Sequence, residues 1–133
     1  MISRKTPGSF VPLAQELKKE KNVRFAYVYG SALTRADAGD IDIAVYLGKK
    51  TDYWSAAQKI ALRLEKRAGF SRKFDIHPLN GAPPSFAFEV MKKGRLLFER
   101  GKENRLVWEA HMLSRYQDIR PMLEFHDRRY ISR

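Results

Sequence analysis

Two aspartates, Asp40 and Asp42, lie two residues apart in the segment Asp-Ile-Asp-Ile-Ala-Val-Tyr-Leu, residues 40–47. Apolar residues alternate with them, which predicts a strand with one apolar face and both carboxylates on the other. At ~4 Å and an effective dielectric near 20, two carboxylates repel each other by about 4 kcal/mol. A divalent cation between them relieves this repulsion, and oxygen-only ligands favour Mg²⁺ or Mn²⁺ over zinc. The pair therefore predicts a metal site.

A glycine and a serine, Gly30 and Ser31, follow a run of apolar and aromatic residues at 23–29. Such a run predicts a strand that is covered on both faces. The glycine allows a sharp turn and a close approach to a ligand. The serine hydroxyl can hold a phosphate oxygen, and one helical turn over residues 31–36 would direct its first amides at an anion. Together with the aspartate pair, this turn indicates nucleotide chemistry.

A third carboxylate, Asp75, lies in the segment Phe-Asp-Ile-His, which predicts another strand. Alternation places Phe74 and Ile76 on one face and Asp75 and His77 on the other. Asp75 joins the aspartate pair if this strand lies beside residues 40–47. We interpret His77 as a packed strand histidine in preference to the alternative, a residue that supports the metal ligands or contacts the substrate.

The remaining pattern of apolar and turn residues predicts the elements that hold these strands. They are helices at 10–21, 53–68 and 102–119, a short helix that ends at Gly94, and a strand at 95–99. We expect Trp54 to begin the apolar stripe of the second helix, a row of Leu106, Ala110 and Leu113 to face the core, and Pro121 to interrupt the last helix. The predicted fold is α+β, a mixed sheet flanked by helices in one domain over 1–133, with a core at about 9–100 and a C-terminal helix and tail at about 102–133.

Gly30-Ser31, Arg35 and Asp40-Ile41-Asp42, followed by Ile43-Ala44-Val45, resemble the signature of the nucleotidyltransferase superfamily with a DNA-polymerase-β-like fold. Asp75 fits the place of the family's third carboxylate. The short chain resembles the minimal nucleotidyltransferases (MNT), which are the antitoxin halves of toxin–antitoxin pairs with a HEPN-type toxin. The resemblance covers residues 23–80, and it implies the nucleotidyltransferase fold.

This resemblance also implies a two-metal mechanism in which Mg²⁺, or Mn²⁺, assists ATP. In it, Asp40 and Asp42 hold the metal that accompanies the triphosphate, and all three aspartates, including Asp75, hold the metal that activates the attacking hydroxyl. The residues expected to bind the nucleotide are Gly30, Ser31 and Arg35.

Composition limits the remaining classes of protein. The chain has 133 residues, no cysteine and a net charge of +11. It can therefore have no disulfide, thiolate zinc site or cysteine nucleophile. No apolar run approaches the ~20 residues of a membrane helix, and residues 1–7 do not have a secretory pattern, so we expect a cytoplasmic protein with no membrane contact. The charge favours an anionic partner, but the absence of a long basic block disfavours a dedicated nucleic-acid-binding protein.

Three functional hypotheses follow. By resemblance, the chain is an antitoxin that transfers AMP from ATP to a tyrosine hydroxyl of a HEPN-type toxin. Alternatively, it is a catalytically weak module that neutralises a partner by contact, which the short connection from Ala32 to Gly39 favours. A third hypothesis is transfer to RNA or a small molecule. The sequence leaves an oligomer open.

Overall fold

The computed structural model describes residues 10–33, 39–69 and 72–131, with side chains as far as Glu124. The elements are α1 (Val11–Leu17), β1 (Val23–Tyr29), the 3-10 turn η2 (Gly30–Leu33), β2 (Asp40–Leu47), α2 (Tyr53–Arg67), β3 (Lys73–Pro78), α3 (Pro84–Lys93), β4 (Arg95–Glu99) and α4 (Lys102–Ile131). The strands form one sheet in the order β3-β2-β1-β4. β1 is antiparallel to β2 and β4, whereas β2 and β3 are parallel. The predicted mixed sheet with flanking helices is confirmed.

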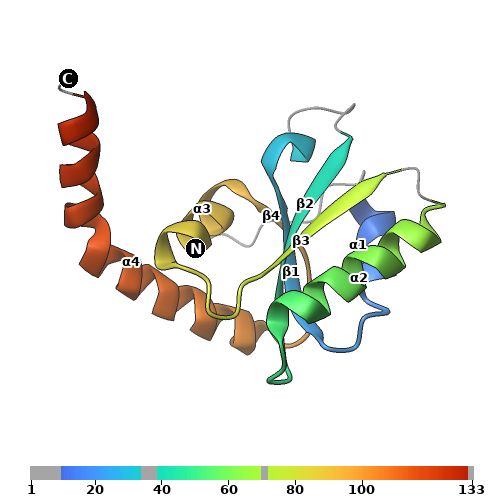
Figure 1. The fold of residues 1–133 in the computed structure, drawn as a ribbon. Coiled ribbons are helices and arrows are strands. Elements are labelled where there is room, and N and C mark those ends of the chain that lie inside the picture. The colour runs from blue at the N-terminus through green and yellow to red at the C-terminus, as the bar shows by residue number, and fades with distance from the viewer. Residues whose placement is uncertain (1–9, 34–38, 70–71, 132–133) are drawn as a thin grey trace.

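Helices cover both faces of the sheet, with α1 and α2 on one side and α3 and α4 on the other (Figure 1). On the first side, the apolar row of β2, which includes Ile43 and Val45, packs with Leu64 of α2. On the second side, Phe25 packs with Val90 of α3 and with the helix α4. β1 contributes buried residues to both cores, so the prediction of a strand covered on both faces is confirmed.

The start of α2 differs from the predicted apolar stripe. Trp54 is 57% exposed, and the buried residues of the helix are Ala57, Ile60 and Leu64. The helix begins after Asp52, whose carboxylate accepts the backbone N–H of Ser55 at 3.1 Å. The core-facing row starts one turn after Trp54, and this leaves the tryptophan beside the edge strand.

The last helix corrects two predictions. α4 runs through Pro121 to Ile131, and it bends partway along its length (Figure 1), as helices that contain proline commonly do. Leu106 and Ala110 are exposed, whereas Arg105, Trp108, Glu109 and Met112 are buried. The buried charged residues satisfy one another. Arg105 donates to Glu109 at 3.1 Å and to Glu99 of β4, and the hydroxyl of Tyr27 donates to Glu109.

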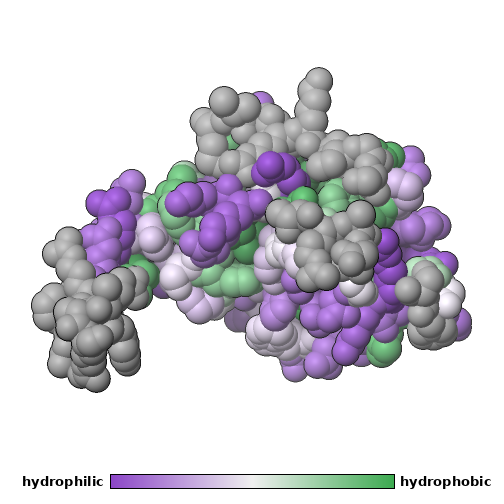
Figure 2. All heavy atoms as spheres, turned by 90° about the horizontal axis from the view of Figure 1, so that it is seen from above, coloured by the Kyte–Doolittle hydropathy of each residue, from purple (hydrophilic) through white to green (hydrophobic). Residues whose placement is uncertain are grey.

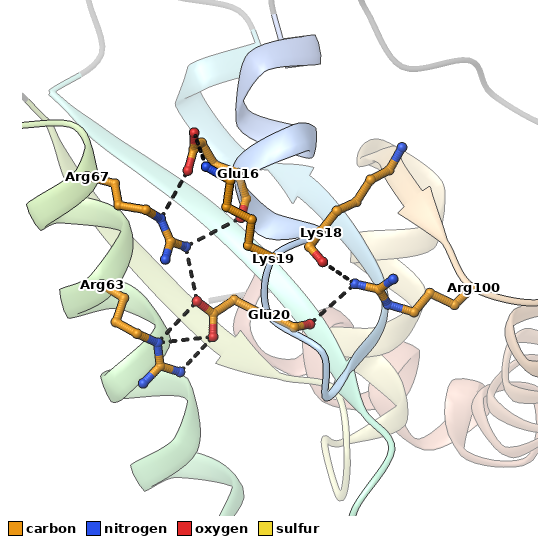
Figure 3. Close-up of polar contacts among 7 residues, drawn as sticks. All are labelled: Glu16, Lys18, Lys19, Glu20, Arg63, Arg67 and Arg100. Atoms are coloured by element: carbon orange, nitrogen blue, oxygen red, sulfur yellow. Dashed lines mark hydrogen bonds and ion pairs between the residues drawn. The ribbon is translucent and has the colours of Figure 1, made fainter.

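The first helix is shorter than predicted, since it ends at Leu17 rather than near residue 21. The chain then turns, and this brings the buried carboxylate of Glu20 toward α2 (Figure 3). Arg63 donates to Glu20 at 2.6 Å and Arg67 donates to it at 3.0 Å. In the part of the chain that the structure describes, no helix combines the length and the apolar character needed to cross a membrane.

Candidate active site

Three side chains meet across three neighbouring strands at the end of the sheet where β2 begins. Tyr29 of β1 pairs in register with Asp42 of β2, and Asp42 pairs in register with Asp75 of β3. Residues directly opposite each other in a sheet point to the same face. Asp40 lies two residues before Asp42 and is exposed, so alternation directs it to that face as well. The two strands thus bring Asp42 and Asp75 together, with Asp40 at the rim.

The turn after β1 lies directly against this row. Gly30 has a backbone φ of +79°, which residues other than glycine rarely adopt. A Cβ at this position would overlap the carboxylate of Asp42. Ser31 is exposed in the same 3-10 turn. The turn is therefore held close to the carboxylates. Arg35 lies outside the described residues.

The electrostatics of the row are those of crowded carboxylates. Burial raises the pKa of Asp42 above its ordinary value, and the negative charges of Asp75 and Asp40 add to this rise, while His77 opposes it. Burial also raises the pKa of the Tyr29 hydroxyl, followed by the charges of Asp42 and Asp75. The site consequently favours a positive charge, either a proton or a cation, next to Asp42.

The donor set suits a hard divalent cation. Asp40, Asp42 and Asp75 offer only oxygen ligands, and the pKa of Asp42 is raised first by burial and then by the charges of its neighbours, both of which a bound cation would counteract. Within residues 10–33, 39–69 and 72–131, however, no three Asp, Glu, His or Cys side chains are already gathered in a metal-coordinating group. The strands therefore supply the carboxylates on one face, and a cation would have to draw them together.

Sequence reasoning did not connect Tyr29 with the carboxylates. The run at 23–29 was expected only to be covered on both faces, yet Tyr29 lies opposite Asp42, and the signal was its position directly before Gly30. His77, which was expected on the face of Asp75, lies among aromatic rings. Half-buried His77 has its ring centroid 5.4 Å from that of exposed Trp54 and 5.8 Å from that of Phe86. These rings extend the carboxylate face along β3. The view from this end shows both hydrophilic and hydrophobic side chains on the surface (Figure 2).

A lysine, Lys73, is a further neighbour that the sequence analysis did not single out. It is exposed at the start of β3, and its register partner is Asp40. Alternation along β3 places Lys73 on the same face as Asp75. Lys73 thus adds a positive charge at the rim of the acidic row, where it can attract a phosphate-bearing ligand.

Comparison with solved structures identifies similar folds among toxin–antitoxin complexes. A chain of a variant MntA–HpeT toxin–antitoxin complex is 17% identical with a TM-score of 0.73, and the match covers 90% of this chain and 96% of that one. A chain of a toxin–antitoxin complex with AMP-PNP is 19% identical with a TM-score of 0.72, over 89% and 98% of the two chains. A chain of the complex between the tri-AMPylated Shewanella oneidensis HEPN toxin and its MNT antitoxin is 22% identical with a TM-score of 0.64, over 90% and 98%.

These likenesses confirm the fold and the predicted resemblance to MNT proteins of HEPN–MNT pairs. No curated protein matches the sequence. The family model described as polymerase beta, nucleotidyltransferase matches residues 12–103, which include the turn after β1 and all three aspartates. The chain therefore belongs to the polymerase beta nucleotidyltransferase family.

Proposed function

We propose that this chain is an antitoxin that transfers AMP from ATP to a tyrosine hydroxyl of a HEPN-type toxin. The observation that carries the proposal is the opposition of Asp42 and Asp75 in adjacent parallel strands, beside a glycine turn that contacts Asp42. Membership of the nucleotidyltransferase family supports the reaction class. The similar folds that were solved with AMP-PNP and with an AMPylated HEPN toxin support the nucleotide and the acceptor.

Each residue of the site has a role in this proposal. Asp40, Asp42 and Asp75 would hold Mg²⁺ or Mn²⁺, which would neutralise the triphosphate and lower the pKa of the attacking hydroxyl. The backbone at Gly30 lies close to the phosphates, and Ser31 donates a hydrogen bond to them. Arg35, in the same connection, neutralises phosphate charge. Lys73 assists at the rim of the site.

The reaction forms one phosphorus–oxygen bond, breaks another and moves one proton. The tyrosine oxygen attacks the α-phosphorus of ATP, and the bond from this phosphorus to the oxygen that bridges to the β-phosphate breaks. Pyrophosphate leaves with the electron pair of that bond. The proton of the hydroxyl passes to the carboxylate of Asp75, which is exposed to solvent and can therefore release it to water. The products are an O-AMP tyrosine and pyrophosphate.

ATP labelled at the α-phosphate tests the proposal. Wild-type protein and Asp75→Asn are each incubated with the label, Mg²⁺ and an extract of the source cells. We expect label in a protein band with the wild type and none with the variant. Label in RNA would mean that the acceptor is RNA and not a tyrosine of a toxin. A third outcome is that the protein binds ATP but transfers no AMP, even to an added HEPN-type partner that it neutralises. This outcome would favour inhibition by contact alone.

A further inference from the structure

A basic cleft lies at the end of the sheet opposite the carboxylates. It has a volume of about 590 Å³, and it is formed by the connection from α1 to β1, the connection from β2 to α2, and one side of α2. Figure 1 shows the two connections at the lower end of the sheet, away from η2 and from the start of β2. Its cationic lining residues are Lys21, Arg24, Lys49, Lys50, Lys59 and Arg63.

Most of this positive charge is not compensated within the structure. Two acidic residues line the cleft, Glu20 and Asp52. Glu20 is engaged by Arg63 and Arg67 (Figure 3), and the carboxylate of Asp52 caps α2. Among the described residues, no carboxylate pairs with any of the remaining five cations of the lining. Such a concentration of like charge, gathered from separate parts of the chain, favours an anionic ligand.

Hydrogen bonds hold the two connections together in a fixed arrangement. The backbone N–H of Gly48 donates to the carbonyl of Asn22 at 2.9 Å, and the N–H of Lys49 donates to the Asn22 side chain at 2.7 Å. A Cβ at Gly48 would overlap the guanidinium of Arg24, so this arginine lies directly over the loop. The cleft is therefore a built feature and not a chance gathering of mobile lysines.

The chemistry of the lining favours phosphate over an acidic protein surface. Four of the six cations are lysines, which bind phosphate as point charges, and Thr51 adds a hydroxyl. The lining has no aromatic side chain and only Ala56 and Ile60 as apolar residues, whereas protein interfaces usually depend on aromatic or large apolar anchors. The interfaces of proteins with nucleic acids are more polar and more positively charged than protein–protein interfaces.

We propose that this cleft is a second anion site, separate from the carboxylates, which binds a chain of phosphates such as the backbone of a single-stranded nucleic acid or a free polyphosphate. Both carboxylates of its lining are already engaged, Glu20 by Arg63 and Arg67 and Asp52 by the first turn of α2, so neither is offered to a metal ion. Binding here is thus independent of Mg²⁺, and this property separates it experimentally from the nucleotidyltransferase site.

Fluorescence anisotropy with a labelled single-stranded RNA of 12 uridines, in EDTA and at several salt concentrations, tests the inference. The double variant Lys50→Gln/Lys59→Gln removes two exposed charges from the cleft. The control Lys66→Gln/Lys102→Gln removes two exposed charges elsewhere. For single strands, each phosphate contact contributes about 0.7 to the salt slope. We expect the salt slope of the cleft variant to be smaller than that of the wild type by about 1.4. Its affinity for the RNA should fall at least tenfold, whereas the affinity of the control variant should fall less than threefold.

Inorganic tripolyphosphate, added as a competitor and titrated separately by calorimetry, distinguishes the two sources of phosphate. Binding of tripolyphosphate but not of RNA, with the same loss in the cleft variant, supports a free polyphosphate. An equal loss in both double variants would overturn the inference, because net charge alone would then explain the binding. Equal binding of poly-L-glutamate would also overturn it in favour of an acidic protein, as would the absence of binding to either phosphate probe.

Discussion

Asp42 and Asp75 lie directly opposite each other in the parallel register of β2 and β3. Neither strand alone brings two carboxylates together in this way, because Asp40 and Asp42 are separated along one strand by about 7 Å. Parallel pairing makes the spacing between the carboxylates a property of the sheet. It also explains why burial and Asp75 both raise the pKa of Asp42. The fold therefore holds a repulsive pair in place, and a bound cation would stabilise it.

A methyl group at Gly30 tests the contact between the turn and the carboxylates. We expect Gly30→Ala to lower the free energy of unfolding by about 1–2 kcal/mol because of its positive φ, and to abolish Mg²⁺-dependent ATP binding because its Cβ displaces Asp42. Urea unfolding and a nucleotide titration measure the two effects. The matched control is Gly39→Ala, since a Cβ there has open space and no positive φ. Equal behaviour of the two variants would contradict the role given to Gly30.

The raised pKa of Asp42 predicts how pH changes stability in EDTA. The unfolded carboxyl titrates near its ordinary value of 3.8, and the folded one titrates above it. As pH rises from 3.8 through the folded pKa, the unfolded state loses its proton first, so this group makes the folded state progressively less stable. Relative to Asp42→Asn, the wild type should therefore lose stability over this window. A constant difference in stability between the two proteins from pH 3.5 to 7 would rule out a raised pKa at Asp42.

Magnesium should reverse this loss. At a Mg²⁺ concentration a hundredfold above its Kd, binding to the folded state adds about 2.7 kcal/mol to the free energy of unfolding. We expect thermal unfolding at pH 7 to shift upward with Mg²⁺ in the wild type, and to shift much less in Asp75→Asn. The shift should disappear below pH 3.8, where Asp42 is protonated. An equal shift in wild type and variant would place the ion elsewhere.

The buried carboxylate of Glu20 predicts the opposite dependence on pH. Burial opposes its ionisation, but the hydrogen bonds and charges of Arg63 and Arg67 prevail and lower its pKa below 4.5. The stabilising contribution is present in full above pH 4.5, and it is lost as pH falls through the folded pKa. Glu20→Gln should destabilise the protein by about 1–3 kcal/mol at pH 7 and by less at low pH. The control Glu89→Gln, at an exposed residue, should change stability by less than about 0.5 kcal/mol.

The sequence predicted the sheet well, because strand signals are local. Alternation in β2 and continuous apolar character in β1 gave both strands their observed bounds. The same alternation put Asp75 on the face opposite Phe74 and Ile76. That β3 lies beside β2 follows only from the strand pairing in the structure, because the sequence has no local signal for it.

The errors in α4 have a different origin. Apolar periodicity selected Leu106 and Ala110, while the buried row contains Arg105 and Glu109. Their partners, Tyr27 and Glu99, come from β1 and β4. Charge pairing across distant segments has no local signal, so the sequence alone does not show that these residues are buried. The basic cleft was missed for the same reason, since its cations become neighbours only when two connections meet at α2.

The most direct test of the proposed reaction is the intact mass of the acceptor protein after incubation with ATP and Mg²⁺. We expect a mass increase by one or more AMP units, located on tyrosine, with the wild type and with Asp118→Asn, a control at an exposed carboxylate of α4. We expect no increase with Asp75→Asn. The proposed reaction would be contradicted by unchanged transfer with Asp75→Asn, or by a HEPN-type partner that the wild type binds and neutralises but does not modify.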